Sequence, residues 1–586
     1  MSQRSDPIQR AFSSGEVSPL LHGRDDFQRH QTGLAQCRGF IPLRGGGATR
    51  QPGTRYLGRT RQDAKARLIP FSFNDDDALV LEFSEQRMRV WRYGALVTSG
   101  GSPYELTTPF TWANVKALHF AQSADVIYLA DGANPPQKLS RLALDNWTIA
   151  ELQLAGGPVR ALHAGSKTVQ ASAEFGTITL TASSSLFTSA QVGSLFSLTV
   201  ENWDAVPFWT GNVNVSTGDR VRYDGRVYEC TNAGGGNTGV NPPLHRQGRE
   251  LSAADGVVWT YRSTDTGLVR ITAVASGTSA TAEVLDRIPS ELTAAGTPLW
   301  REGAFSAKHG YPAAVTFFDE RLWFGGTRAD PRAVWASTLG AYEDFAAGEV
   351  DQAISYTLAG GNGRDRIVWM QPSQRELYVG TRGGVHTGRS TVTQEAISTE
   401  NATFSGAAGD GQHDAQPIAV DGRPIAISRD RRRVFEFRYV IERDAVEPLE
   451  LSLPAEHLGA DRFERIAWQT SPLRMAWIPR DGGGDPVVMV YEQNEDVLGW
   501  APLSFAGGAI EDIAVTPGLD GDDDLLLIVR RTIGGATVRH VEQVSDWWGL
   551  LTGDIDIAER LRRRWCAGRS AADRRRRPAP ASRRCP

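Results

Sequence analysis

The sequence contains few cysteines. There are only four in 586 residues, Cys37, Cys230, Cys566 and Cys585, and none belongs to a Cys-x-x-Cys pair. This spacing excludes a small disulfide framework and a zinc site built on such pairs, and we expect isolated thiols in a reducing cytosol. No stretch approaches the roughly 18 apolar residues of a membrane helix, and the start of the chain lacks the apolar core of a secretion signal. We therefore expect a protein made in the cytoplasm, without a membrane span, that stays soluble or joins an assembly.

Lysine is also scarce, with 5 Lys against 58 Arg. The arginines are unevenly distributed. From Arg560 to Pro586 there are eleven Arg and one acid, a local charge of +10, so the rest of the chain, which makes up the difference from the total of -5, carries -15. An acidic body argues against a protein that grips duplex DNA, which needs Lys and Arg facing the phosphates.

The usual catalytic motifs are missing. The sequence has no HExxH, no GxSxG and no GxxxxGK[ST]. Gly234–Gly239 fits GxGxxG but lies in a glycine-rich loop without a strand–helix unit. The acidic run from Asp520 has Leu525 where a calcium loop needs Gly, so it predicts a solvated hairpin turn, as does Asp75–Asp77. We expect no enzyme, cofactor or metal. A propeller glycoside hydrolase is the alternative, and it would need two carboxylates about 5–9.5 Å apart.

Glycine and tryptophan are abundant, with 61 and 16 residues, and strand-like alternation is frequent. A hairpin with an aromatic or apolar second strand recurs along the chain. Successive copies are separated by 37 to 57 residues, except at one gap of 195 residues. Such a period is typical of four-stranded propeller blades, which cover one another and leave short edges. The alternative is a set of unrelated β-sandwiches. Representative positions are Leu81, Tyr128, Trp323, Tyr378, Phe435, Val490 and Leu527.

The long gap indicates an inserted domain. The fold class expected is mainly β, a propeller-like platform interrupted by an inserted β domain that carries a small module, with an extended N-terminal arm. The expected regions are 1–60 (arm), 61–155 (first blades), 156–305 (insert, with the module at 203–264), 306–548 (remaining blades) and 549–586 (basic tail).

The module has a distinctive aromatic pattern. Gly218-Asp219-Arg220-Val221-Arg222-Tyr223 and Gly225-x-x-Tyr228 lie between two tryptophans, and the pattern resembles small carbohydrate-binding modules of the chitin-binding kind. The resemblance implies that aromatic rings stack on the apolar faces of sugars. The alternative is that these rings form the core of the module. The candidate glycan-binding residues are Trp209, Tyr223, Tyr228, Trp259 and Tyr261.

The N-terminal region carries a longer pattern. Phe12–Arg24 reads F-x-x-G-E-x-S-P-x-L-x-G-R, and the Gly- and Pro-rich strings Gly33–Leu43 and Gly45–Arg55 follow. This region resembles the tail nozzle proteins of short-tailed bacteriophages, also called distal tail tubular or packaged-DNA stabilisation proteins. Matching strings near the other end of the chain are Glu495–Trp500, Gly508–Val515, Leu527–Gly535 and Arg539–Glu542.

The resemblance implies a virion protein that forms a homohexameric ring below a tail adaptor and portal. Duplex DNA would leave through the lumen without specific binding. Tail fibres and a host surface glycan are further expected partners, and an adhesin that binds glycan through the insert is the alternative function. The arm is expected to dock on a neighbouring subunit or on the adaptor, and a self-contained edge of the first blade is the alternative. The candidate contact residues are Phe12, Glu16, Pro19, Arg24, Arg50, Pro52 and Arg55.

The C-terminus departs from the family pattern. Relatives continue into a further β domain, whereas residues 549–586 are rich in Arg, Pro and Ala. Such a composition predicts a disordered tail or a frame-altered end. A nucleic-acid-binding tail is the third alternative.

Overall fold

The computed structural model describes residues 9–24, 26–73, 77–251, 256–348, 350–360, 365–392, 394–443, 445–519 and 521–545. Within these ranges the protein is mainly β, as the sequence predicts, and the α-helices are two short ones, α1 (Trp112–Ala117) and α2 (Glu291–Ala294). Three features of the sequence analysis lie outside the described residues: the basic tail at 549–586, Asp75 and Asp76 of the predicted turn, and Asp520. The short 3-10 helices are Pro19–Leu21, Gln28–Thr32, Arg61–Asp63, Ser189–Gln191, Trp203–Ala205, Ile441–Arg443, Leu453–Asp461 and Gln493–Glu495.

The chain forms two compact units. One contains the residues up to Glu82, Trp91–Leu96 and the residues from Ser452 onward, and the other contains Phe83–Val90 and Val97–Leu451. The chain passes between them within β7 and β8, two strands of the sheet with order β12-β8-β7-β6. These strands and the short ones near them are β6 (Arg67–Ser72), β7 (Ala78–Ser84), β8 (Arg87–Arg92), β9 (Ala95–Leu96), β10 (Thr98–Ser99), β11 (Ser102–Pro103) and β12 (Glu105–Thr107).

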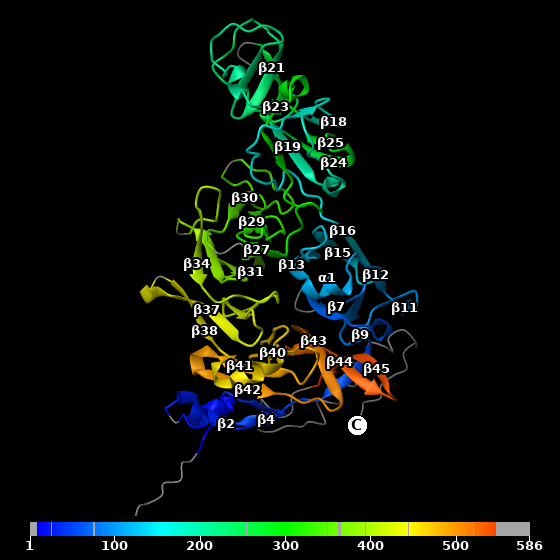
Figure 1. The fold of residues 1–586 in the computed structure, drawn as a ribbon, viewed down its shortest axis with the longest axis vertical. Helices are drawn as coiled ribbons and strands as arrows, with labels where there is room; N and C mark the ends of the chain where they lie inside the picture. The colour runs from blue at the N-terminus through cyan, green and yellow to red at the C-terminus, as the bar shows by residue number, and fades with distance from the viewer. Residues whose placement is uncertain are drawn as a thin grey trace, which may run out of the picture. The chain divides into compact units, whose positions relative to one another are not determined.

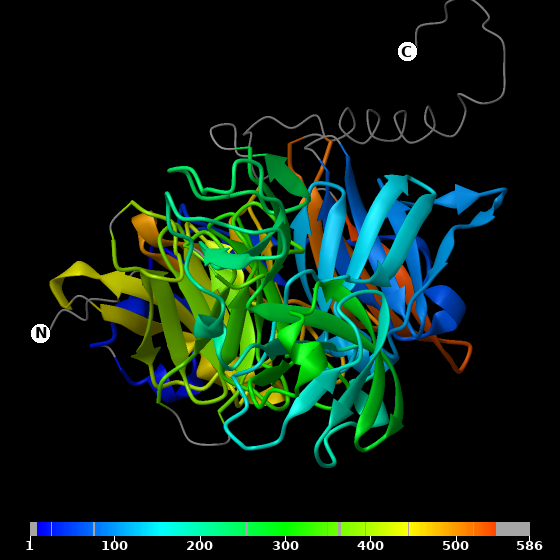
Figure 2. The ribbon, with the colours of Figure 1, turned by 90° about the horizontal axis from the view of Figure 1, so that it is seen from above.

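The second unit contains four antiparallel sheets whose four strands follow one another in chain order. Figures 1 and 2 show the strands of each sheet side by side in two orthogonal views. The sheets are β13 (His119–Ser123), β14 (Val126–Ala130), β15 (Gln137–Ala143) and β16 (Asn146–Glu151); β27 (Ala314–Phe318), β28 (Arg321–Gly325), β29 (Ala333–Ala336) and β30 (Ile354–Thr357); β31 (Ile367–Pro372), β32 (Leu377–Thr381), β33 (Val385–Ser390) and β34 (Ala402–Ala408); β35 (Ile418–Val420), β36 (Arg423–Ile427), β37 (Val434–Val440) and β38 (Ala445–Glu450).

Successive sheets of this unit pack face to face. Strand β28 shows why its sequence, Arg-Leu-Trp-Phe-Gly, is almost wholly apolar. Leu322 and Phe324 pack with Tyr128 of the sheet before, whereas Trp323 between them packs with Met370 of the sheet after. Alternate side chains of a strand point to opposite faces, so a strand covered on both faces must be apolar at every position. This stacking of four-stranded sheets is the arrangement of propeller blades.

The first unit contains two further sheets: a six-stranded one of order β2-β1-β42-β41-β40-β39, in which β1 (Gly15–Glu16) and β2 (Gly33–Leu34) extend four antiparallel strands, and a four-stranded one of order β43-β44-β45-β5. Their other strands are β39 (Ala467–Gln469), β40 (Met475–Ile478), β41 (Val487–Glu492) and β42 (Val497–Pro502); β43 (Gly508–Pro517), β44 (Asp523–Ile533), β45 (Ala536–Val544) and β5 (Thr54–Arg59). The fourth strand of the last sheet is supplied by the N-terminal region, because β5 pairs with β45. The contact joins the two ends of the sequence within one sheet.

The insert forms two sheets. Its six-stranded sheet has the order β17-β18-β25-β24-β19-β26, and the module has a four-stranded sheet of order β20-β21-β23-β22 (Figure 1). The fold is therefore a propeller-like platform interrupted by a β domain that carries a small module. The strands are β17 (Val169–Ala171), β18 (Thr177–Ala182), β19 (Leu195–Thr199), β20 (Arg220–Tyr223), β21 (Arg226–Asn232), β22 (Arg249–Leu251), β23 (Val258–Thr264), β24 (Thr266–Ser276), β25 (Ser279–Asp286) and β26 (Trp300–Glu302).

All the repeat positions lie on the second strand of a hairpin, as predicted, but two of these hairpins sit one strand later in their sheets than the others. Phe435 is on β37 and Val490 is on β41, the third strands of their sheets, whereas Trp323 and Tyr378 are on second strands. Strand β41 is apolar on both faces, and β37 carries Phe435 and Phe437 on one face, so a hairpin that ends in a third strand resembles one that ends in a second strand. The sheets themselves are unaffected by this shift.

Candidate functional site

The N-terminal string packs on the last sheets of its own chain. Gly15–Glu16 (β1) pairs in parallel with β42 and with β2 (Gly33–Leu34). Glu16 is buried, and it accepts hydrogen bonds from the backbone N–H of Cys37 (2.7 Å) and from Nε2 of His457 (3.0 Å). Although burial opposes it, these two hydrogen bonds hold the pKa of Glu16 below its ordinary value. The Glu16 carboxylate therefore ties the string to two distant parts of the chain.

The residues that follow Glu16 turn outward. The Ser18 hydroxyl accepts from the backbone N–H of Leu20 (3.4 Å) at the start of the 3-10 helix Pro19–Leu21. Leu20 is 79% exposed. Arg24 is exposed, and its partner among the described residues is Asp26, through two hydrogen bonds of 2.7 Å. This turn presents an apolar and a cationic side chain to solvent.

Arg50 and Pro52 line a cavity of about 710 Å³ in the first unit, and Arg55 is not part of its lining. Its lining consists of Thr49–Thr54, Ser504–Ala506 and Arg531. Arg531 forms a bidentate ion pair with Glu542, in which its Nε and Nη2 donate to the two carboxylate oxygens at 2.7 and 2.8 Å. Arg55 donates to the side-chain oxygen of Gln543.

The N-terminal region is therefore not an extended arm in the single chain. Phe12, Glu16 and Pro52 contact their own chain: the Phe12 N–H donates to the carbonyl of Gly46, and Pro52 is buried. The region is not an edge of the first blade either, because β5 completes the sheet of β43, β44 and β45. Contact with a neighbouring subunit stays a prediction for the exposed members of the set, Pro19, Arg24, Arg50 and Arg55.

The module aromatics mostly form its core, which corrects the expectation that they stack on sugar. Trp209, Tyr228 and Trp259 are buried together with Cys230, and Tyr223 and Tyr261 pack partly against them. The Tyr228 hydroxyl donates to the carbonyl of His245 (3.0 Å). A sheet of four short strands has little else with which to exclude water, so its large rings are turned inward.

Burial raises the pKa of Cys37 to about 11 and also raises that of Cys230, and both thiols are free.

One exposed ring of the module was missed by the sequence reasoning. Phe208 is 57% exposed, and its ring lies 5.4 Å from that of the half-buried Tyr223. The guanidinium of Arg222 lies 5.9 Å from the Phe208 ring and is held by the carbonyl of Val206 (2.9 Å). Because Trp209 points inward, the alternation of an extended segment places Phe208 outward. This alternation was the available sequence signal.

A partly buried polar cluster, with His309 at its centre, joins the insert to the platform. Glu302 of β26 accepts from Nε2 of His309 (2.6 Å) and from Nζ of Lys308 (2.6 Å). Arg160 donates to Nδ1 of His309 (3.2 Å) and makes two hydrogen bonds to Asp330, of 2.7 and 3.0 Å. His309 thus donates through Nε2 and accepts at Nδ1. The four segments are up to 170 residues apart in sequence, which is why no local motif indicates the cluster.

The cluster makes the insert junction sensitive to acid. Although burial opposes it, hydrogen bonds from His309 and Lys308 lower the pKa of Glu302 below its ordinary 4.5. Its contribution to stability is therefore present above the unfolded-state pKa and is lost as pH falls through the lower folded-state value. We expect Glu302→Gln to cost about 1–3 kcal/mol at pH 7, and this difference to shrink below pH 4.5. Thermal unfolding across pH 3–7 measures it. The exposed Glu283→Gln is the control, and an equal effect of both changes at pH 7 would contradict the prediction.

Metal and membrane features were searched over the part of the chain that the structure describes. No group of three or more His, Cys, Asp or Glu side chains there is arranged to hold a metal ion. No helix there has both the length and the apolar character needed to span a membrane.

No protein-family model and no curated protein matches this chain. Among solved structures, it is similar to a 6-phosphogluconolactonase-like protein from Bacteroides uniformis, with 12% identity, 60% of this chain and 97% of that chain covered, and a TM-score of 0.27. It is also similar to the N-terminal domain of Nup159, with 8% identity, 84% and 96% covered, and a TM-score of 0.26. A third structure is the dihydro-heme d1 dehydrogenase NirN, with 10% identity, 84% and 78% covered, and a TM-score of 0.33. At these values the similarities carry no inference about what this chain does.

Proposed function

We propose that this chain is a subunit of the ring-shaped distal tail, or nozzle, of a short-tailed bacteriophage. The phage genome would be retained above the ring and would then leave through its lumen. The ring, and the number six for its copies, come from the sequence resemblance alone. In this function the protein has a structural role, with no reaction to catalyse.

The observation that carries the proposal is that one part of the N-terminal string packs on its own chain while another part is exposed. Gly15 and Glu16 are used to attach the string to its own chain, whereas Leu20 and Arg24 of the same string are held in solvent. The capped turn at Ser18 fixes the direction of the exposed side chains. An exposed apolar side chain and an exposed arginine within one short segment suit a contact with a second protein.

The charge of the chain agrees with a conduit for DNA. Outside the Arg-rich C-terminal residues the chain carries -15. Duplex DNA has one phosphate charge per ~1.7 Å, so each pairing Lys or Arg adds affinity and friction, while carboxylates repel the polymer. A wall that must let DNA slide is therefore better acidic than basic.

Ring formation is tested by electron microscopy and mass photometry of the purified protein, alone and with its adaptor. We expect ring-shaped particles of a single kind of subunit, closed by heterologous contacts. Leu20→Asp or Arg24→Glu should weaken assembly at least tenfold, about 1.4 kcal/mol. Leu519→Asp, at an exposed leucine of a hairpin turn, is the control and should assemble normally. A protein that stays monomeric with and without adaptor would refute the proposal.

The second candidate function is an adhesin that holds cell-surface glycan through the inserted module. The specific observation is the exposed ring of Phe208 beside Tyr223 and Arg222. Two rings and a guanidinium form a surface on which the apolar face of a sugar can stack, with weak binding at each site. A ring of subunits would multiply such binding through avidity, so the two functions are compatible.

A further inference from the structure

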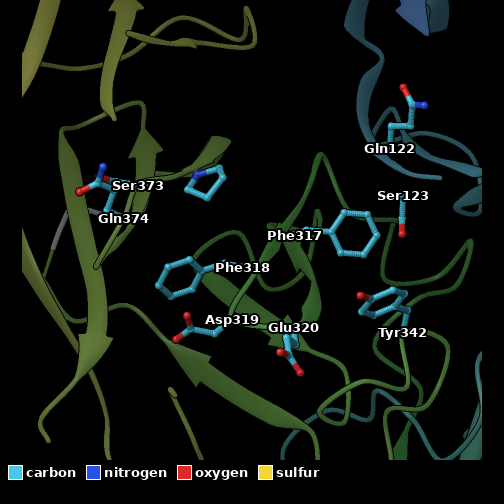
Figure 3. Close-up of a pocket in the computed structure, with 10 residues that line it drawn as sticks. Gln122, Ser123, Phe317, Phe318, Asp319, Glu320, Tyr342, Ser373 and Gln374 are labelled. Carbon is cyan, nitrogen blue, oxygen red and sulfur yellow. The ribbon is translucent and has the colours of Figure 1, made fainter. Parts of the chain in front are cut away.

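A groove separate from the module crosses three sheets of the second unit (Figure 3). Its volume is about 480 Å³, within the range of roughly 300–1,000 Å³ typical of ligand pockets. The lining comes from β13 and its turn, from the β27–β28 hairpin, from the loop after β29 and from the β31–β32 turn. These residues are Gln122, Ser123, Phe317, Phe318, Asp319, Glu320, Tyr342, Pro372, Ser373 and Gln374.

Aromatic rings form part of the groove wall. Phe317 and Tyr342 lie together beside Ser123, and their ring centroids are 4.8 Å apart at 62° (Figure 3). Tyr128 packs edge-on against the other side of Phe317 at 5.7 Å, which fixes the position of that ring. Such a preorganised pair offers apolar surface without loss of side-chain freedom on binding.

The polar lining is rich in groups that both donate and accept hydrogen bonds. Two serines, two glutamines and a tyrosine line the groove together with Asp319 and Glu320 (Figure 3). The lining contains no lysine or arginine, so an anionic ligand such as phosphate is disfavoured.

The two carboxylates differ in their surroundings. Asp319 accepts from the backbone N–H of Ile397 (3.1 Å), and the buried guanidinium of Arg321 lies close enough to interact with its charge. Arg321 also donates to the carbonyls of Ser337 and Gln352, both at 2.7 Å. Glu320 therefore adds the one uncompensated charge among the described lining residues, and its carboxylate can accept hydrogen bonds from the hydroxyl groups of a neutral polar ligand.

The turn that carries these carboxylates is unusual for this chain. Six described hairpins have two-residue turns in which both residues have positive φ, and in five of them the second residue is glycine: Gly94, Gly101, Gly225, Gly422 and Gly535. In the sixth, Asp319 (φ 46°) is followed by Glu320 (φ 54°). Glutamate is strained in this conformation and glycine is not. The fold thus holds a carboxylate at the groove where glycine would be the more stable choice.

We propose that this groove binds a neutral oligosaccharide. The rings of Phe317 and Tyr342 would contact the apolar face of a sugar, and the Glu320 carboxylate would accept hydrogen bonds from its hydroxyl groups. The mixed donor and acceptor groups of the remaining lining match the alternating hydroxyls of a sugar. This site is distinct from the module and does not depend on ring assembly.

A glycan array of neutral oligosaccharides, followed by calorimetry on the strongest ligand, tests the site. The full chain with Phe208→Ala is used, so that the module does not contribute. We expect Tyr342→Ala to weaken binding at least tenfold and Glu320→Gln about fivefold. Glu320→Gly should also lose binding, with a melting temperature equal to or above that of its parent, because the strained turn is relieved. Tyr439→Ala, an exposed tyrosine on β37, is the control and should bind normally.

Three results would overturn the inference. The first is that no neutral oligosaccharide binds at millimolar concentration. The second is that binding is unchanged in Glu320→Gly, the variant expected to stay folded. The third is that an oligolysine peptide binds instead and is released by salt, which would mean that the groove takes a cationic partner.

Discussion

Gly15→Ala is expected to detach the N-terminal string and to destabilise the protein by about 3 kcal/mol or more. Gly15 has φ +62°, and a Cβ there would lie 2.2 Å from the carbonyl oxygen and 2.8 Å from the nitrogen of Trp500. Both atoms belong to the backbone of β42, so the neighbour cannot move aside. Shifting β1 would also break the two hydrogen bonds that hold the Glu16 carboxylate.

Denaturant unfolding and limited proteolysis of residues 10–60 measure this effect. Gly23→Ala is the matched control: it lies in the same string, and a Cβ there would meet no atom within 4 Å. That variant should stay within about 0.5 kcal/mol of the parent. If the two alanine variants were equally stable, the string would not be attached as the structure shows.

Trp259→Ala is expected to unfold the inserted module, with a loss of about 3–5 kcal/mol. Trp259 is 3% exposed and packs with Trp209, Tyr228 and Cys230. The loss should appear in near-ultraviolet circular dichroism and as protease cleavage within residues 203–264. The stacked sheets elsewhere in the chain have their own core clusters and should keep their transition.

Phe208→Ala is the partner variant for the same module. Its ring is largely in solvent, so we expect its melting temperature to change little while any glycan binding by the module is lost. If Trp259→Ala instead left the module folded and abolished glycan binding, then Trp259 would be a binding residue and the buried position would be wrong. If neither change affected glycan binding, the module would have no part in it.

The acid sensitivity of the insert junction and ligand binding at the groove are expected to be independent of one another. Glu302, His309 and Arg160 hold the insert at its base, whereas the groove is built from the hairpin turns at Ser123, Glu320 and Gln374. Among the described residues, the two sites therefore share none. A variant at one site leaves the other site as an internal control.

The blade-like sheets could be predicted from the sequence because strand periodicity is a local property. In Arg321–Gly325 the run Leu-Trp-Phe indicates a strand buried on both faces, and the structure places it between two sheets. The limit of the same signal is seen at Phe435 and Val490. Each lies on the aromatic or apolar second strand of a hairpin, and the pattern alone does not say which place in the sheet that hairpin takes.

The module illustrates the same limit at a candidate site. Aromatic spacing located Trp209, Tyr223, Tyr228, Trp259 and Tyr261, but it does not tell a core ring from a ligand-binding ring. The side of the sheet decides this, and it follows from the partner strands. Phe208, which has no place in the aromatic pattern, is the ring that is exposed.

Periodicity, turn residues and charge were thus sufficient for the β class, the repeated sheets, the position of the insert and the acidic body, because each depends on residues that are close together in the chain. Tertiary structure alone decided that β5 completes the sheet of β45, that Glu16 pairs with His457, and that Glu302, His309, Arg160 and Asp330 meet. Apart from Glu302 and His309, which are 7 residues apart, these partners are separated by 149 to 490 residues in sequence. Such contacts depend on how the sheets stack, which is a property of the whole core and leaves no local trace in the amino-acid sequence.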